Sequence, residues 1–166
     1  MGKLQKSHNS IKHDYFPVYI NSNGKKAVVI GGGNIAARRI KTLSKFNFEI
    51  AVISPEINEE IKELEKNGEI TFIKDNFKAE YLEGAFLAVA ATNNRSVNEE
   101  VGRISKENNI FVSVADKKEE CNFYFPAIAD DENIVVGICG SGNNHKEVSK
   151  KAESIRNDLN KEADIN

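Results

Sequence analysis

The sequence predicts an α/β fold, in which a doubly wound parallel sheet is followed by a β-hairpin and a C-terminal helix. Apolar segments of strand length alternate with amphipathic helical segments through the first part of the chain, and a glycine-rich turn joins the first such strand to its helix. After Cys121 the alternation gives way to two adjacent apolar runs. Alternating strands and helices form a parallel sheet covered on both faces, and 166 residues suffice for one such domain with a small appendage.

The strands expected in the sheet are short and rich in apolar residues. Tyr15–Ile20 comes first, and Pro17 places it at an edge because proline cannot donate to a strand ladder. The remaining strands are predicted at Lys26–Ile30, Phe48–Ile53, Ile70–Ile73, Ala85–Ala91 and Ile110–Ala115.

The helices between these strands show apolar residues at helical spacing. The first is predicted to begin just after Gly33, the second to run from Glu56 to Lys66, and the third to be capped by Ser96 and to end near Asn108. The faces expected to be buried carry Ile35, Ala36, Ile40, Leu43 and Phe46 in the first helix, Ile57, Ile61 and Leu64 in the second, and Val97, Val101 and Ile104 in the third. A short segment over Ala79–Leu82 links two strands.

The C-terminal part has a different pattern. Phe123–Ile128 and Ile134–Ile138, joined by a polar turn at Asp130–Asn133, predict a hairpin, and a helix is expected over about Lys146–Leu159. Residues 1–14 are polar and lack periodicity, so they are expected to form a flexible lead-in.

Composition excludes several classes of protein. A net charge of −2 gives no general attraction to nucleic acid, and no apolar run approaches the length of a membrane-spanning helix. The N-terminal residues lack the apolar region of a signal peptide, so a cytoplasmic location is expected. Cys121 and Cys139 lie far apart and the three histidines are scattered, so no metal site is expected.

The glycine-rich turn reads Gly31-Gly32-Gly33-Asn34-Ile35-Ala36, and it matches the dinucleotide-binding fingerprint, whose third small residue can be alanine. Gly31 allows a sharp turn, Gly33 allows the backbone to approach a pyrophosphate, and the helix start offers N–H groups to the phosphates. The predicted strand before the turn and helix after it supply the context this motif needs. We therefore expect a Rossmann-like NAD-binding domain over residues 15–115, with residues 116–166 forming a second part.

The residues after the second strand depart from the usual fingerprint. An acidic residue normally accepts a hydrogen bond from the ribose of NAD at this point, whereas this chain has Ser54-Pro55-Glu56. Glu56 lies close enough in sequence to substitute, and no arginine stands at the turn for a 2′-phosphate. The sequence leaves the choice between NAD and NADP open.

Polar residues follow two further strands at the edge where such sheets bind ligands. Thr92-Asn93-Asn94 comes after one strand, and Asp116 comes directly after another. Asp116 is the best candidate in the sequence for transferring a proton or orienting a substrate. The residues alone nevertheless favour a structural role, because aspartate after a strand commonly caps a turn.

Four separated motifs resemble the precorrin-2 dehydrogenase family, which includes the dehydrogenase and chelatase part of siroheme synthase. They are Tyr15-Phe-Pro-Val-Tyr19, the strand and glycine turn from Val28 to Arg39, Ala88 to Asn94 with Asn98, and Val112 to Asp116 with Cys121-Asn-Phe-Tyr-Phe-Pro126. Their order and spacing hold from about Tyr15 to Ile138.

The resemblance implies an NAD-dependent oxidation of precorrin-2, a tetrapyrrole, to sirohydrochlorin in siroheme or cobalamin biosynthesis, with iron or cobalt insertion by some relatives. It implies a homodimer whose hairpin strands take part in the interface and whose C-terminal part borders the active site. It ties Asp116 to catalysis. Cofactor contacts are implied at Asn34, Ile35, Pro55, Glu56, Thr92 and Asn93, and we add Gly31, Gly33 and Ser54 from the motif itself.

Two other hypotheses stay open at this point. Relatives carry a serine-rich turn and a proline-led helix where this chain has Cys139-Gly-Ser-Gly-Asn-Asn-His145, and they carry more helical sequence after the hairpin. These differences suggest a non-catalytic sensor of a dinucleotide or tetrapyrrole as the first alternative. A regulatory domain of a larger assembly is the second.

Overall fold

A computed structural model describes residues 15–140 and 144–163 of the chain, and the lead-in predicted for residues 1–14 lies outside them. Contacts between residues divide the described chain into two compact units. One unit runs from Asn21 to Phe125, and the other combines the described residues up to Ile20 with those from Pro126 onward. Each unit is described by itself below.

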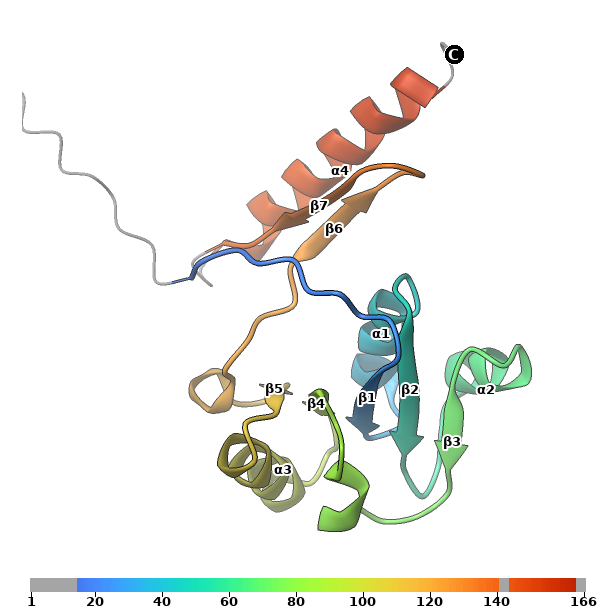
Figure 1. The fold of residues 1–166 in the computed structure, drawn as a ribbon, viewed down its shortest axis with the longest axis vertical. Coiled ribbons are helices and arrows are strands. Elements are labelled where there is room, and N and C mark those ends of the chain that lie inside the picture. The colour runs from blue at the N-terminus through green and yellow to red at the C-terminus, as the bar shows by residue number, and fades with distance from the viewer. Residues whose placement is uncertain (1–14, 141–143, 164–166) are drawn as a thin grey trace, which may run out of the picture. The chain divides into compact units, whose positions relative to one another are not determined.

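The larger unit is built on a five-stranded sheet in which every neighbouring pair of strands is parallel. The strand order is β3-β2-β1-β4-β5, so the chain moves outward from β1 in one direction and then returns to build the other half (Figure 1). This is the doubly wound arrangement predicted from the sequence. The strands are β1 (Lys25–Ile30), β2 (Phe48–Ile53), β3 (Thr71–Ile73), β4 (Leu87–Ala90) and β5 (Phe111–Val114).

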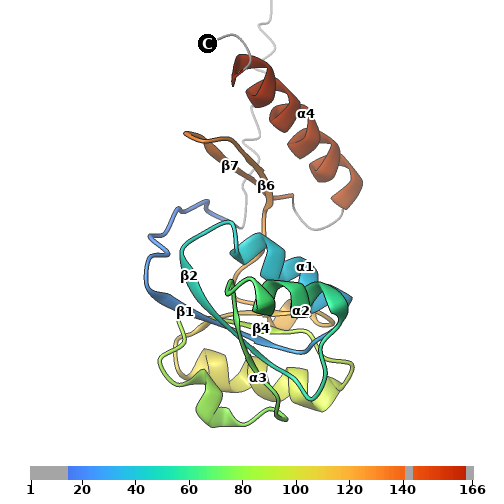
Figure 2. The same ribbon diagram turned by 90° about the vertical axis from the view of Figure 1, so that its right-hand side faces the viewer.

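Helices cover both faces of this sheet (Figure 2). On one face lie α1 (Asn34–Leu43) and α2 (Glu59–Lys66), and on the other lie α3 (Arg95–Glu107) and the 3₁₀ turn η1 (Ala79–Leu82). Side chains alternate along β1 between the two cores: Ala27 and Val29 pack with α1, whereas Val28 and Ile30 pack with α3. The central strand is therefore apolar at successive positions, as expected for a strand buried on both faces.

Two predicted helix starts are wrong, and side-chain caps explain both. The helix α2 begins at Glu59 rather than Glu56, because the Asn58 side chain accepts a hydrogen bond from the Ile61 N–H. The helix α3 is capped by Asn94 rather than Ser96, since the Asn94 side chain accepts hydrogen bonds from the first N–H groups of the helix.

An aromatic segment ends the larger unit and corrects the predicted start of the hairpin. After the 3₁₀ turn η2 (Lys118–Glu120), Phe123 and Phe125 pack against the core on the α1 side of the sheet. Their ring centroids lie 5.1 Å apart, and the Arg39 guanidinium lies over the Phe125 ring. Partial burial lowers the pKa of Arg39. Because these aromatic residues pack as core side chains, the first hairpin strand begins at Ala127 rather than Phe123.

The smaller unit contains the predicted hairpin and helix with shifted ends. The antiparallel strands are β6 (Ala127–Asp130) and β7 (Val135–Ile138), and α4 spans His145–Ala163. The Asp131 carboxylate accepts hydrogen bonds from the N–H groups of Asn133 and Ile134, which closes the hairpin turn. The Arg156 guanidinium donates to the Ile128 carbonyl at 2.7 Å and ties α4 to β6.

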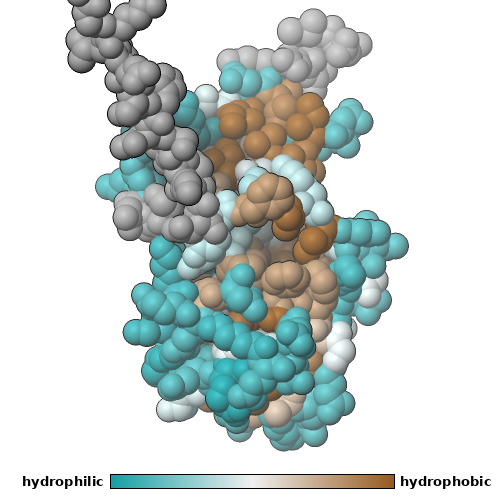
Figure 3. All heavy atoms as spheres, turned by 60° about the vertical axis from the view of Figure 1, so that its left-hand side comes forward, coloured by the Kyte–Doolittle hydropathy of each residue, from teal (hydrophilic) through white to brown (hydrophobic). Residues whose placement is uncertain are grey.

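The edge strand predicted at Tyr15–Ile20 is absent from the structure, so that prediction is wrong. The segment is irregular, and its contact with β7 comes from a side chain: the Tyr19 hydroxyl donates to the Val135 carbonyl at 3.2 Å. Phe16 is 86% exposed and Tyr19 is 74% exposed. In Figure 3, hydrophobic side chains gather on the surface of this smaller unit. The same unit also exposes Val18, Ile20, Ile134 and Val135.

None of the described helices is both long enough and apolar enough to cross a membrane.

Candidate functional site

The candidate site lies where the strand order reverses, between β1 and β4. At this point the chain leaves β1 for a helix on one face and leaves β4 for a helix on the other, and doubly wound sheets bind their ligands at such a point. The Ala91 N–H donates to the Ile30 carbonyl at 2.8 Å, which fixes the end of β4 beside the end of β1. The Ala115 N–H donates to the Ala90 carbonyl and brings the end of β5 to the same edge.

Gly31 and Gly32 are required by close contacts within the protein. Gly31 has a φ of 121°, and a Cβ there would lie 2.3 Å from the Ala91 carbonyl oxygen. A Cβ on Gly32 would lie 1.9 Å from the Glu56 carbonyl oxygen. The Asn58 N–H also donates to the Gly32 carbonyl at 2.9 Å. These glycines allow the glycine turn to press against the loops that follow β2 and β4.

Gly33 is different, because a Cβ there would meet no protein atom within 4 Å. Its φ of −92° is open to any residue, so nothing in the protein itself requires glycine at this position. Gly33 is also the N-cap of α1, and no side chain caps the first N–H groups of that helix. Open space in front of uncapped N–H groups and the positive end of a helix dipole fits a bound phosphate, as the pyrophosphate of a dinucleotide requires.

The next two predicted contacts lie on the first turn of α1. Asn34 and Ile35 are both exposed, and Ile35 exposes 47% of its surface. The Asn34 side-chain oxygen accepts a hydrogen bond from the Asn58 side chain at 3.1 Å, which joins the start of α1 to the loop before α2. The structure therefore places both residues beside the glycine turn.

The loop after β2 brings Ser54, Pro55 and Glu56 to the glycine turn, but in different roles. Ser54 is buried, and its hydroxyl donates to the Glu56 carbonyl at 2.7 Å, so its side chain shapes the loop. Pro55 and Glu56 are exposed. They belong to a shallow hollow at the carboxyl ends of β2 and β3 whose other lining residues are Ile57, Lys62, Phe72 and Lys74. Its lining combines apolar and charged side chains.

The loop after β4 is organised by a buried side chain, Asn98. The Asn98 side-chain oxygen accepts hydrogen bonds from the Thr92 N–H at 3.0 Å and from the Thr92 hydroxyl at 2.7 Å. Its side-chain nitrogen donates to the Thr92 carbonyl and, also at 3.0 Å, to the Asp116 carboxylate. Asn93 is exposed at the tip of this loop. Asn98 thus joins the predicted cofactor loop to the predicted catalytic carboxylate.

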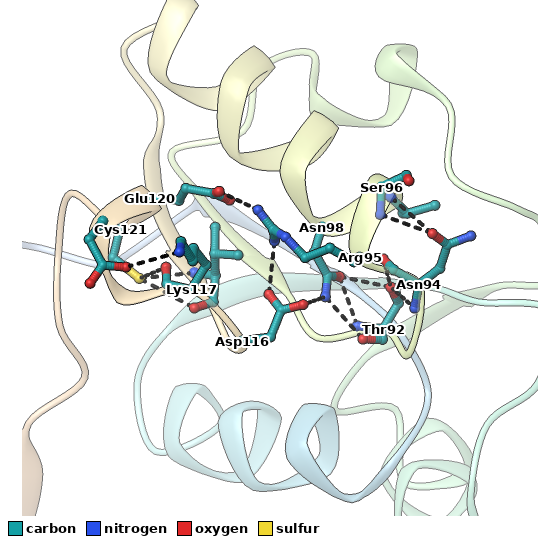
Figure 4. Close-up of polar contacts among 12 residues, drawn as sticks. Thr92, Asn94, Arg95, Ser96, Asn98, Asp116, Lys117, Glu120 and Cys121 are labelled. Atoms are coloured by element: carbon teal, nitrogen blue, oxygen red, sulfur yellow. Dashed lines mark hydrogen bonds and ion pairs between the residues drawn. The ribbon is translucent and has the colours of Figure 1, made fainter.

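Asp116 lies beside this loop, and both of its carboxylate oxygens have donors (Figure 4). One oxygen accepts from Asn98, and the other accepts from the Arg95 guanidinium at 3.0 Å. The same guanidinium also donates to Glu120. Hydrogen bonding to Glu120 raises the pKa of the Arg95 guanidinium, opposed by partial burial and reinforced by the charges of Asp116 and Glu120.

Cys121 also has a structural role at this edge of the sheet. The Val114 N–H donates to its sulfur at 3.2 Å, so the thiol group holds the end of β5 (Figure 4). Among the residues that the structure describes, there is no group of three histidine, cysteine or acidic side chains able to hold a metal ion.

Sequence reasoning missed three residues at this site, Gly32, Arg95 and Glu120. Gly32 occupies a variable position of the fingerprint, and its need for glycine comes from Glu56 farther along the chain. Arg95 and Glu120 appeared in the sequence as ordinary charged residues, and only the fold brings them together with Asp116. The opposite charges of Arg95 and Asp116 just after neighbouring strands were the one available signal.

These features define a dinucleotide-binding protein of the Rossmann class, and comparison with known proteins agrees. Residues 18–127 match the NAD_binding_7 family, described as "Putative NAD(P)-binding". The chain belongs to this family. Together with the relatives and the solved structure that follow, this match confirms the resemblance to the precorrin-2 dehydrogenase and siroheme synthase family noted in the sequence.

Named relatives show how far the similarity extends. The chain is 39% identical over 155 residues to the "Probable multifunctional siroheme biosynthesis protein HemA" of Ruminiclostridium josui, covering 93% of this chain and 30% of that protein. It is 33% identical over 129 residues to the siroheme synthase of Photorhabdus laumondii, covering 78% of this chain and 27% of that enzyme. The chain therefore spans less than a third of these relatives.

A solved structure is similar over most of its length. The structure described as SirC, a precorrin-2 dehydrogenase, matches with a TM-score of 0.73 and 28% sequence identity. The match covers 87% of this chain and 71% of that one.

Proposed function

We propose that this protein oxidises precorrin-2 to sirohydrochlorin with NAD as the hydride acceptor, in siroheme or cobalamin biosynthesis. The observation that carries the proposal is the position of Asp116, a hydrogen-bonded carboxylate at the same sheet edge as a glycine turn with open space in front of an uncapped helix. Similarity to SirC and to siroheme synthases supports the choice of substrate.

The cofactor-binding residues act mainly through backbone and shape. The N–H groups after Gly33, on Asn34 and Ile35, would hold the pyrophosphate, and the exposed Ile35 side chain would cover it. Pro55 and Glu56 would border the adenosine, with the Glu56 carboxylate accepting from a ribose hydroxyl. Thr92 and Asn93 would border the nicotinamide half, while Ser54 and Gly31 hold the loops in place. Bound NAD supplies an acceptor for a hydride.

Asp116 would act as the general base. Oxidation of precorrin-2 by two electrons removes one hydride and one proton, and the proton needs an acceptor near the reacting carbon. One oxygen of the Asp116 carboxylate accepts a hydrogen bond from Asn98 and the other accepts one from Arg95. Each oxygen therefore keeps a second lone pair that can accept the proton. Its side chain is 39% exposed, which leaves it accessible to a substrate.

The proposal is tested by incubating the purified protein anaerobically with precorrin-2 and either NAD or NADP, and by following sirohydrochlorin and reduced cofactor by absorbance. We expect sirohydrochlorin to form with NAD. Binding of the cofactor without any oxidation would contradict the proposal and would favour the non-catalytic sensor instead. Adding ferrous or cobaltous ion to the product tests chelation separately.

We also propose that the protein is a homodimer in the cytoplasm. The support is the exposed apolar surface of the smaller unit, which includes Phe16, Val18 and Tyr19 beside the hairpin. A second copy would cover this surface. Sedimentation equilibrium should give a dimer mass for the wild type and a monomer for a Phe16→Asp, Val18→Asp double variant. A monomeric wild type would refute the dimer.

A further inference from the structure

The site holds one charged side chain whose role the proposed reaction does not explain. Arg95 is the first residue of α3, and its guanidinium contacts two carboxylates that come from different elements. One is Asp116, in the turn after β5, and the other is Glu120, in η2. Figure 4 shows the guanidinium lying between them.

The two ion pairs differ in exposure. The Glu120 side chain is 25% exposed, and one of its oxygens is buried without a hydrogen-bond partner among the described residues. Arg95 is therefore the cation that compensates this carboxylate, and separating them would leave a partly buried charge unpaired. Asp116 is more exposed, at 39%. Glu120 thus anchors the guanidinium, and the anchored guanidinium in turn holds Asp116.

The second observation is that the two oxygens of Asp116 have different donors. Asn98 donates to one carboxylate oxygen and Arg95 to the other. One donor leaves a carboxylate free to rotate about its terminal bond, whereas a donor to each oxygen fixes its plane. Asn98 is fully buried and held by three hydrogen bonds to Thr92, so it is a rigid donor. Arg95 is long and flexible, and it becomes a fixed donor only through Glu120.

We propose that Arg95 is a positioning residue for the reaction, which fixes the plane of the Asp116 carboxylate, and that Glu120 is the anchor that makes this possible. The proposal rests on the role proposed for Asp116. Arg95 need not contact substrate or cofactor to do this. Its loss leaves the base present but poorly aligned, which lowers the rate of the chemical step and leaves binding unchanged.

The test compares steady-state kinetics of the wild type with Arg95→Ala, Arg95→Lys and Glu120→Gln, using precorrin-2 and NAD. Misalignment of a reacting group can cost up to about 100-fold in rate, so Arg95→Ala should lower kcat by about 10- to 100-fold. KM and the Kd for NAD should change less than about twofold, a difference too small to reflect a lost contact. The kcat of Arg95→Lys should lie between those of the wild type and Arg95→Ala, because lysine keeps the charge but loses the planar guanidinium group.

Two further measurements separate positioning from a structural role. Added guanidinium ion at low concentration should restore part of the kcat of Arg95→Ala, and it should leave the wild type unchanged. Glu120→Gln should lower kcat in the same direction but less, since the anchor is weakened rather than removed. Arg103→Ala is the matched control, because Arg103 lies on the same helix and its partner is Glu107, away from Asp116.

The outcomes distinguish this inference from the proposed function. An Arg95→Ala variant that folds and turns over like the wild type would overturn the positioning role and leave the dehydrogenase proposal intact. A loss confined to KM would also overturn it, because it would make Arg95 a binding residue. If Arg95→Ala does not fold, Arg95→Lys and Glu120→Gln decide the question by the same kinetic pattern. A wild type that does not oxidise precorrin-2 would remove the proposed function together with this inference.

Discussion

The glycine turn and the Asp116 cluster lie at the same sheet edge but are built in opposite ways. The glycine turn depends on missing side chains: Gly31 and Gly32 allow neighbouring loops to approach, and Gly33 leaves space in front of a helix. The Asp116 cluster works by side chains, since Asn98 and Arg95 each supply a hydrogen bond. The comparison indicates that added volume should damage cofactor binding, whereas removal of polar groups should damage the chemistry.

The largest effect is expected at Asp116. Asp116→Asn keeps the size of the side chain but cannot accept the proton, and general-base catalysis typically contributes about 10²–10⁴-fold to a rate. We expect kcat to fall within that range while the Kd for NAD, measured by calorimetry, stays the same. Weakened NAD binding would contradict the separate roles of the two regions, because it would make Asp116 part of the cofactor site.

The next effect is expected at Gly33. Gly33→Val places a branched side chain where the pyrophosphate would lie, so NAD affinity should fall at least about 30-fold, or about 2 kcal/mol. The melting temperature without cofactor should fall only slightly, because valine caps a helix less well than glycine but its Cβ meets no protein atom within 4 Å. Normal NAD binding by this variant would refute the assignment of the turn.

A pair of alanine substitutions separates the structural role of Gly32 from the role of Gly33 in cofactor binding. Gly32→Ala forces a Cβ against the Glu56 carbonyl and should reduce the free energy of unfolding by about 1–3 kcal/mol, a typical cost of overpacking. Gly33→Ala is the matched control and should cost less, at most about 1 kcal/mol, because alanine caps a helix less well than glycine but its Cβ meets no protein atom here. Chemical denaturation of both variants measures the difference, and equal stabilities would contradict the close contact at Gly32.

The smallest effect is expected at the cap of α3, the helix that carries Arg95 and Asn98. Asn94→Ala removes the side chain that accepts from the first helical N–H groups and should cost about 1 kcal/mol of stability. Ser96→Ala serves as the control and should cost little, because the cap is at Asn94. If Ser96→Ala lowered the melting temperature more than Asn94→Ala, the cap would be Ser96, as expected from the sequence.

Local patterns in the sequence located the five strands of the parallel sheet but not every boundary, and they also predicted a strand at Tyr15–Ile20 that the structure lacks. The strand Phe48–Ile53 has the predicted ends because its apolar run is bounded by polar residues and a proline. The predicted strand at Phe123 failed because an apolar aromatic run reads the same whether it pairs as a strand or packs as core. The strand predicted at Tyr15 failed in the opposite way, because its apolar run is exposed on the surface instead of pairing in the sheet.

The site residues also differ in how far local sequence patterns could predict them. The fingerprint identified the glycine turn because its physics is local, in a strand end, a turn and a helix start. The resemblance to a known family singled out Asp116, for which the residues alone favoured a structural role. The partners of Asp116 could not be predicted, because Arg95 and Glu120 are 25 residues apart and meet only in the folded chain. Tertiary contacts between polar side chains leave no periodic signal.

The most direct test of the whole account is a single-turnover experiment with the wild type and anaerobic precorrin-2 in the presence of excess NAD. We predict that sirohydrochlorin and NADH form in equal amounts and at one common rate, that Gly33→Val restores this rate only at much higher NAD, and that Asp116→Asn stays slow at any NAD concentration. Precorrin-2 that remains unoxidised by a wild type saturated with NAD would contradict the account.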